Sequence, residues 1–293
     1  MSDQFDVIEA GGRGRRRWIG LAVVLTLLVI PAVSLLLSRD PGSGLPAPSS
    51  TAPIRSLTRI DNGPHALRVP ARTKGHDEII DVVFPDGRRA EVRYPADLDL
   101  NELGVRPFQG AWIDGQFRRL GVPYNGVAEV TGGGRPIRSY GPDVTLWPRQ
   151  PGSGGEGQTL LFVFGQWRMV MQDPGQGLTF DQRMALAREL HGRTTKDGFL
   201  VLSGKGSVRL AGPGATAQGD PVGPQLWFGG GVREVVALVP IPDCARKARL
   251  PSVIAGRGYP GEWTCQGDVE IAVAGSTDFR KRALAGIRVT LGR

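Results

Sequence analysis

An uncharged apolar run near the N-terminus restricts this chain more than any other feature. Trp18 to Leu37 spans about 20 residues without a charged side chain. A helix that rises ~1.5 Å per residue would cross ~30 Å over that run, the thickness of a bilayer core. Four arginines precede the run, and this excess of positive charge places the N-terminus in the cytoplasm. We therefore expect a transmembrane helix over 18–38 behind a cytoplasmic tail, residues 1–17.

A cleavable signal is the alternative to an anchor. Its apolar core would span ~7 to 15 residues and would end close to a small-x-small site. Here the run is longer, and the nearest such triplet, Ala47 to Ser49, lies well downstream. Arg15 and Arg16 loosely resemble a twin-arginine signal, but the apolar run is stronger than such signals usually carry. We expect an anchor that stays in the cell membrane, with the C-terminal domain outside.

Residues 39–58 are rich in Pro, Gly and Ser and have few apolar side chains. Such a segment cannot bury enough surface to fold, and it predicts a tether with a reach of ~25 Å. The remaining residues, 59–293, carry most of the 43 Gly and 23 Pro of the chain. That content favours many turns, so we expect an α+β, β-rich extracytoplasmic domain. The Gly-rich stretch 150–158 is a possible boundary within it.

Two hairpins and two helices are predicted from local patterns. Alternating apolar residues flank Pro85-Asp86-Gly87 in a hairpin over 78–95, and Gly165-Gln166 in another over 159–172. Residues 178–193 predict a helix that begins at a capping box and stops at Gly192. We also expect a helical turn or two over 97–103 and a short helix near 277–284. Further strands are predicted near 111–120, 126–131, 143–147, 198–203, 207–211, 232–239, 264–274 and 286–291.

The two cysteines, Cys244 and Cys265, each adjoin an apolar run. If those runs pair as antiparallel strands, the cysteines meet at one end of the pair. The expected compartment permits disulfides. We therefore predict a structural Cys244–Cys265 bridge, with two free thiols or a reactive cysteine as the alternative.

Catalytic and cofactor motifs are missing from the sequence. No Ser lies in G-x-S-x-G, and no Lys follows a Ser by three residues, as wall transpeptidases of the S-x-x-K type require. The Gly-rich stretches lack the strand and helix that phosphate binding needs. The histidines, His65, His76 and His191, do not stand at metal-ligand spacing. We expect no cofactor and no metal.

One enzyme family offers a partial resemblance. His191, then Thr264-Cys265, then Arg280 or Arg282 follow the order His, Thr-Cys, Arg. In this the chain resembles sortases, wall transpeptidases that are often anchored by an N-terminal segment and carry a β-barrel outside. The resemblance implies Cys265 as nucleophile, with His191 and Arg280 beside it. Residues 262 and 263 depart from the family's T-L-x-T-C strand, and a Cys244 bridge would remove the thiolate.

The amount and position of positive charge indicate which kinds of partner the chain could bind. The net charge is +8, of which the tail supplies only about +1, so the excess lies beyond the anchor. No run of Lys and Arg interleaved with aromatics follows residue 40, which argues against nucleic acid. We expect a non-enzymatic binding or scaffolding protein of the cell envelope, whose partner is another envelope protein or an anionic envelope polymer. A sortase-like cysteine transpeptidase is the alternative.

Overall fold

The computed structural model describes residues 65–149, 157–230, 234–256 and 258–292. The expected tail, transmembrane helix and tether all lie outside these residues. Contacts divide the chain into Met1–Ile60 and Asp61–Arg293, and every described residue belongs to the second unit. Among the described residues, no helix is both long enough and apolar enough to cross a membrane.

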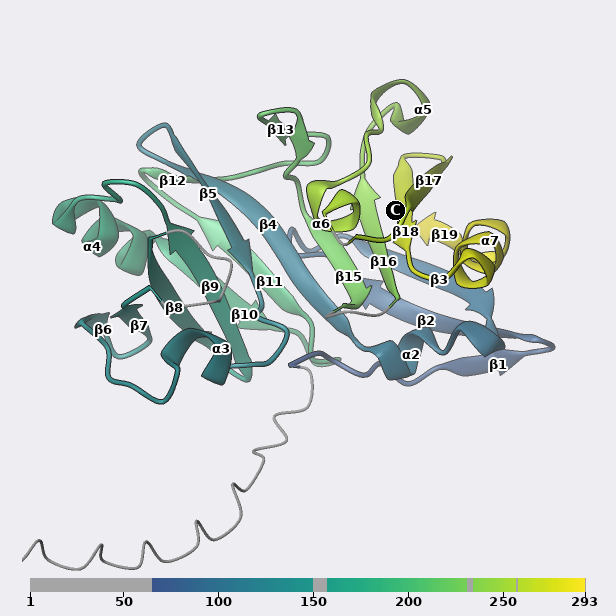
Figure 1. Ribbon diagram of the computed structural model, residues 1–293, viewed down its shortest axis with the longest axis horizontal. Helices are drawn as coiled ribbons and strands as arrows, with labels where there is room; N and C mark the ends of the chain where they lie inside the picture. Colours follow the sequence, from purple (N-terminus) through teal and green to yellow (C-terminus); the bar gives the residue numbers. More distant parts are fainter. Residues whose placement is uncertain (1–64, 150–156, 231–233, 257, 293) are drawn as a thin grey trace, which may run out of the picture. The chain divides into compact units, whose positions relative to one another are not determined.

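An 11-stranded antiparallel sheet runs through the second unit (Figure 1). Its strands follow the order β17-β18-β16-β15-β4-β5-β9-β8-β7-β6, and β12 lies beside β4. The strands are β4 Val105–Ile113, β5 Gln116–Gly121, β6 Arg138–Gly141, β7 Val144–Trp147, β8 Gln158–Phe164, β9 Trp167–Asp173, β12 Val208–Leu210, β15 Gln225–Gly229, β16 Val235–Pro240, β17 Gly261–Gln266 and β18 Val269–Ala274.

Strand β4 joins the two halves of this sheet. Its first residues pair with β15, and its last three pair with β12 along the same edge, while β5 occupies the opposite edge. Between β15 and β12, the Gly110 amide donates to the Val222 carbonyl, and the Ala211 amide donates to the Gly110 carbonyl. One long strand therefore takes part in both halves, as its diagonal course in Figure 1 shows.

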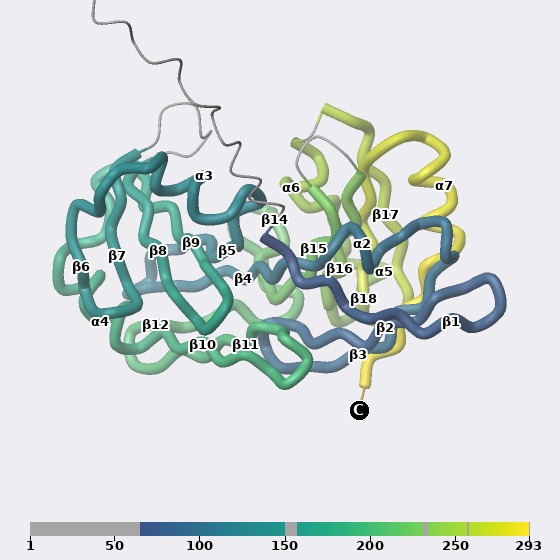
Figure 2. The backbone as a smooth tube through the Cα atoms, turned by 90° about the horizontal axis from the view of Figure 1, so that it is seen from below, coloured from purple at the N-terminus to yellow at the C-terminus, as the bar shows by residue number. Residues whose placement is uncertain are grey.

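The first half of the unit encloses a core between two sheets. A four-stranded sheet, in the order β1-β2-β3-β19, faces β15, β16 and β18 (Figure 2). Its strands are β1 Arg72–Lys74, β2 Asp77–Val83, β3 Arg89–Pro95 and β19 Arg288–Leu291. Short helices η1 Ala96–Leu98 and α2 Leu100–Leu103 follow β3, and α7 Thr277–Gly286 packs its Phe279 and Ala283 into the core. Fully buried side chains there include Ile80, Tyr94, Phe228 and Ile271.

The second half packs β5, β7, β8 and β9 against helix α4 and a separate hairpin. Helix α4 spans Phe180–Glu189, and the hairpin consists of β10 Leu190–Thr194 and β11 Leu200–Gly204. Leu160, Phe162, Met169 and Met171 are fully buried, as expected for a hairpin over 159–172 that supplies core strands.

Strands β16 and β18 are buried along their whole length. One face contacts the first core, and the other is covered by residues 244–255, which we call the cover segment. It contains α5 Cys244–Lys247 and α6 Ser252–Ala255. Burial on both faces explains why these strands read as continuous apolar runs rather than alternating ones. A small hairpin, β13 Thr216–Ala217 and β14 Asp220–Pro221, completes this region.

Three local predictions are wrong in detail. Residues 126–131 form helix α3, Ala128–Thr131, instead of a strand, because Val127 and Val130 lie three residues apart and pack on one side. The predicted strand 111–120 is two strands, β4 and β5, joined at Asp114-Gly115, where both residues have positive φ, as a two-residue hairpin turn requires.

The helix predicted over 178–193 has the expected capping box of Thr179 and Gln182 but ends at Glu189. Residues from Leu190 leave the helix because they pair with β11. Gly192 is therefore a strand residue, and a Cβ there would meet the Phe164 ring. Phe180, the first residue of α4, is half exposed. The unit as a whole is β-rich with some helices, in agreement with the expected α+β class.

Candidate anion-binding pocket

A pocket of about 430 Å³ lies between the β13–β14 hairpin and the start of the cover segment. Figure 1 shows β13 and α5 projecting on the same side of the large sheet. The hairpin turns at Gln218-Gly219, whose positive φ values suit a two-residue turn. We call this cavity the basic pocket; it is lined by Gly214, Thr216, Gly219, Pro221, Ile241, Arg246, Lys247 and Arg249.

The charge of the basic pocket has one sign. Three of the lining residues are cations, and none is acidic. Lys247 lies 3.7 Å from Asp243, and both side chains are largely exposed. Arg246 and Arg249 form no ion pair within the described part of the chain. Two guanidinium groups are therefore available to an anion, and guanidinium binds carboxylate or phosphate through paired hydrogen bonds.

The cover segment is fixed at both ends. At its start, Cys244 is bonded to Cys265 of β17, so the predicted disulfide is confirmed. Cys265 lies on the edge strand β17 and not at the end of β18, so the bridge joins the sheet edge to α5. Further along, the Ser252 amide and hydroxyl each donate to the Asp220 carboxylate at 2.7 Å. These bonds hold Arg246 and Arg249 against the β13–β14 hairpin.

A buried acid lies under the cover segment. Glu270 of β18 is 0% exposed, and neither of its carboxylate oxygens accepts a hydrogen bond of good geometry from the described part of the chain. Because Ile271 faces the first core, Glu270 faces the opposite way, toward the cover segment. Burial raises the pKa of Glu270 to about 7; the Arg249 backbone amide opposes this rise and the charge of Asp220 adds to it.

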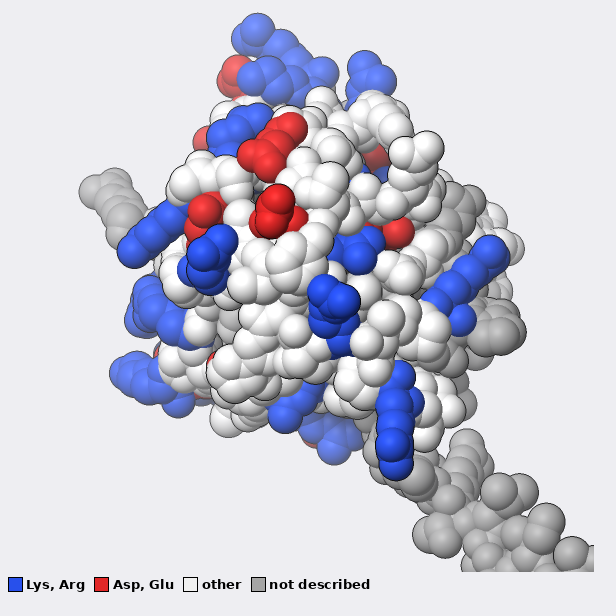
Figure 3. All heavy atoms as spheres, turned by 90° about the vertical axis from the view of Figure 1, so that its left-hand side faces the viewer, with Lys and Arg blue, Asp and Glu red and all other residues white. Residues whose placement is uncertain are grey.

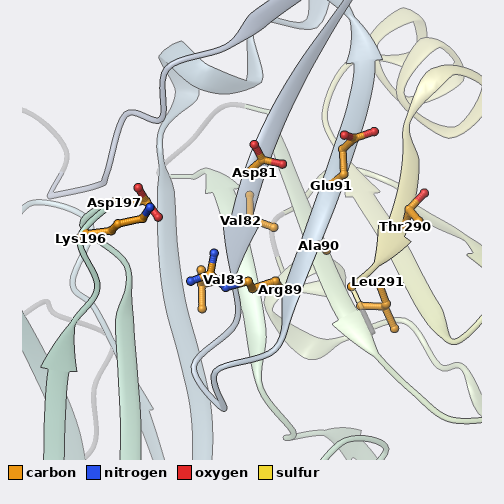
Figure 4. Close-up of a pocket in the computed structure, with 11 residues that line it drawn as sticks. Asp81, Val82, Val83, Arg89, Ala90, Glu91, Lys196, Asp197, Thr290 and Leu291 are labelled. Atoms are coloured by element: carbon orange, nitrogen blue, oxygen red, sulfur yellow. The ribbon is translucent and has the colours of Figure 1, made fainter.

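A second pocket of about 500 Å³ lies on the outer face of the four-stranded sheet (Figure 4). Asp81 and Glu91 stand side by side there, and Lys196 and Asp197 reach it from the β10–β11 turn. Arg72 bridges both Asp81 and Glu91, at 3.0 and 3.5 Å. The charges of this pocket are mixed and partly paired already, so it favours no ligand of one sign.

Basic side chains also lie on the face of the unit that carries α4, which Figure 3 shows. There Lys and Arg are interspersed with acids and uncharged residues, and several basic side chains lie together at the top of the view. The basic pocket differs from this face because three cations and no acid line it.

The three residues of the sortase-like order do not form one site. Cys265 is in the disulfide and has no free thiol. Arg280 of α7 is buried and donates to Glu262 of β17 at 2.9 Å and to the Gly275 carbonyl. It therefore lies near β17. His191 is on β10, which pairs with β11 in the other half of the unit. Figures 1 and 2 both show strand β10 well away from strand β17.

No group of His, Cys, Asp or Glu with metal-binding geometry is found among the described residues. Sequence reasoning missed Arg246, Arg249 and Glu270. For the first two, a signal existed in the three basic residues within five positions after Cys244. For the third, it existed in the single charged residue inside the strand VEIAVA.

Comparisons with protein-family models, curated proteins and solved structures find no match to this chain.

Proposed function

We propose that this chain is a membrane-anchored binding protein of the cell envelope whose outer domain holds an anionic envelope polymer in the basic pocket. The observation that carries the proposal is a 430 Å³ cavity lined by three cations and no acid. A polymer with repeated phosphate or carboxylate groups supplies the complementary charge.

The expected anchor and tether support this role. A helix over 18–38 and a coil over 39–58 would keep the outer domain within ~25 Å of the membrane surface. At that distance the pocket would meet polymers that grow from, or are attached near, the outer leaflet. The protein would hold or organise such a chain without reacting with it.

The transpeptidase alternative lacks comparable support. It requires Cys265 as a thiolate close to His191. Cys265 is bonded to Cys244, and His191 belongs to the β10–β11 hairpin in the other half of the unit. The structure therefore favours the binding role over the enzymatic one.

A binding assay tests the proposal directly. The full-length protein in detergent micelles is titrated with a fluorescently labelled polyglycerol phosphate oligomer, and polygalacturonate replaces it in a second arm to distinguish phosphate from carboxylate. Neutral dextran is the uncharged control. We expect Arg246→Gln/Arg249→Gln to weaken binding by about tenfold or more, since each lost contact is a charge-assisted hydrogen bond.

The matched control is Arg135→Gln/Arg193→Gln, which removes the same charge from two exposed arginines outside the pocket. Equal weakening by both double variants would reveal a non-specific charge effect and refute the pocket. Binding of an acidic protein from the envelope, with no affinity for either polymer, would favour a protein partner instead.

A further inference from the structure

Glu270 stands out among the buried polar residues. Arg106, Gln109, Asp173, Gln225 and Arg280 all form hydrogen bonds inside the unit. Glu270 forms none of good geometry with any residue that the structure describes, and its strand is otherwise apolar. A buried, unpartnered carboxylate is costly, and a group in that position avoids the cost by keeping its proton. The Glu270 side chain is therefore neutral at low pH and ionised at high pH, and it stays buried at one position in the fold.

That place is directly behind the basic pocket. Glu270 pairs with Val239 of β16 and with Cys265 of β17. Ile241, two residues beyond Val239, lines the pocket. The Arg249 backbone amide acts on the Glu270 carboxyl, while the Arg249 side chain lines the cavity. The backbone amide that acts on Glu270 and the cations of the pocket thus belong to one short segment, residues 246–249.

The other charges around Glu270 can be assigned element by element. Strand β16 and helix α6 have no ionisable side chain. Glu262 of β17 is paired with Arg280 and stands opposite Val273, so it lies on the face of the sheet that is turned away from Glu270. Strand β14 contributes Asp220, which is paired with Arg119. The cover segment contributes the three cations of the pocket. Asp278, Arg280, Lys281 and Arg282 of α7 lie on the side of the sheet where Phe279 packs, opposite to Glu270.

We propose that Glu270 is a proton-controlled regulator of the basic pocket: the pocket binds an anionic polymer tightly when Glu270 is protonated and weakly when it is ionised. The inference rests on the proposed function, because it concerns the same pocket. An ionised Glu270 places a negative charge behind Arg249 and repels the bound anion through the low-dielectric interior. By linkage, a bound anion makes ionisation of Glu270 harder by the same free energy.

The direction of the pH effect follows. Burial keeps Glu270 neutral to a higher pH than an exposed glutamate, with a pKa of about 7. As the pH rises through that value, the charge appears and affinity for the polymer falls. We expect the wild type to lose about tenfold in affinity between about pH 5.5 and about pH 8.5. Phosphodiester groups stay ionised across this range, so the ligand does not titrate.

The test uses the full-length protein and the same labelled polyglycerol phosphate oligomer, titrated at several pH values. Glu270→Gln has nearly the same shape as the protonated acid, and it should bind at high pH as tightly as the wild type binds at low pH. Glu270→Met, which fills similar space without a titratable group, should give the same flat profile. All three histidines remain in both variants, so a difference from the wild-type profile arises at position 270. Glu129→Gln, an exposed glutamate on α3, should keep the wild-type profile.

A second readout separates this inference from the proposed function. Infrared difference spectra should show a protonated carboxyl band that disappears as the pH rises in the wild type and is missing in Glu270→Gln. If that band titrates while wild type and both variants bind with the same pH profile, the regulatory role is refuted and the binding function stands. If no variant binds the oligomer at any pH, the proposed function fails. If the band is missing at low pH in the wild type, Glu270 is already ionised and the inference is wrong.

Discussion

Removing the Cys244–Cys265 bridge should destabilise the outer domain by a predictable amount. The two residues are 21 positions apart. In the chain-entropy model, a cross-link that closes a loop of this length restricts the unfolded chain by about 3 kcal/mol. Cys244 is fully buried in the cluster under the cover segment, so Cys244→Ala/Cys265→Ala adds about 1 kcal/mol for the lost sulfur contacts. We expect a total loss of about 4 kcal/mol from the free energy of unfolding.

Urea unfolding of the full-length protein in mild detergent, followed by tryptophan fluorescence, measures this loss. Three samples separate the contributions: oxidised wild type, wild type unfolded in reductant, and the double alanine variant. The reduced wild type should lose about 3 kcal/mol, and the variant should lose slightly more and be insensitive to reductant. Polymer affinity should fall in parallel, because the bridge holds one end of the segment that carries Arg246 and Arg249. An unchanged midpoint on reduction, or alkylation of both thiols without prior reduction, would refute the reasoning.

Three further predictions concern other parts of the unit. In the wild type, the fully buried Asp173 carboxylate pairs with Arg118 and Arg183. Asp173→Ala leaves both guanidinium groups without a counter-charge, so it should lower the free energy of unfolding by about 3 to 5 kcal/mol in thermal or urea melts. A loss below about 1 kcal/mol would contradict that account. Thr179→Ala removes the capping box of α4, so it should lower the free energy of unfolding by about 1 kcal/mol and slightly reduce the helical circular dichroism signal. An unchanged melting curve would show that packing alone sets the start of the helix. Glu270 has a folded-state pKa raised from 4.5 to about 7, so the folded state binds the extra proton. The contribution of Glu270 to stability should be greatest below about pH 4.5 and should fall by about 3 kcal/mol as the pH rises through about 7. Glu270→Gln should remove that contribution, which is measured as the difference between variant and wild type in urea titrations across the same range.

Short-range patterns in the sequence determined several elements. The hairpin over 78–95 formed because Pro85-Asp86-Gly87 supplies the turn and the flanking residues alternate. The hairpin over 159–172 and the capping box at Thr179 have equally local causes. Hydrogen bonds and turn conformations within a few residues suffice in these cases, so tertiary contacts did not alter them.

Tertiary contacts decided the elements that local patterns missed. Helix α4 stops at Glu189 because β11, which follows in the chain, offers Leu190 to Thr194 a ladder of backbone hydrogen bonds. The two cysteines meet at one end of the β16–β18 pair, as predicted, but the sequence pattern did not separate β17 from β18, and Cys265 lies on β17, the edge strand. Pairing partners depend on which other strands are in reach, and a single segment does not specify them.

The basic pocket illustrates most clearly which features follow from local sequence and which depend on tertiary contacts. Residue types and their order indicated an excess of positive charge beyond the apolar run, two cysteines able to pair, and a β-rich body with many turns. Only the tertiary structure brought Arg246 and Arg249 opposite the β13–β14 hairpin, and only it placed Glu270 in full burial behind them. The reason is physical: a residue type and its charge are local properties. Which cavity a side chain lines, and how far it is buried from solvent, depend on chain segments that lie tens of residues away.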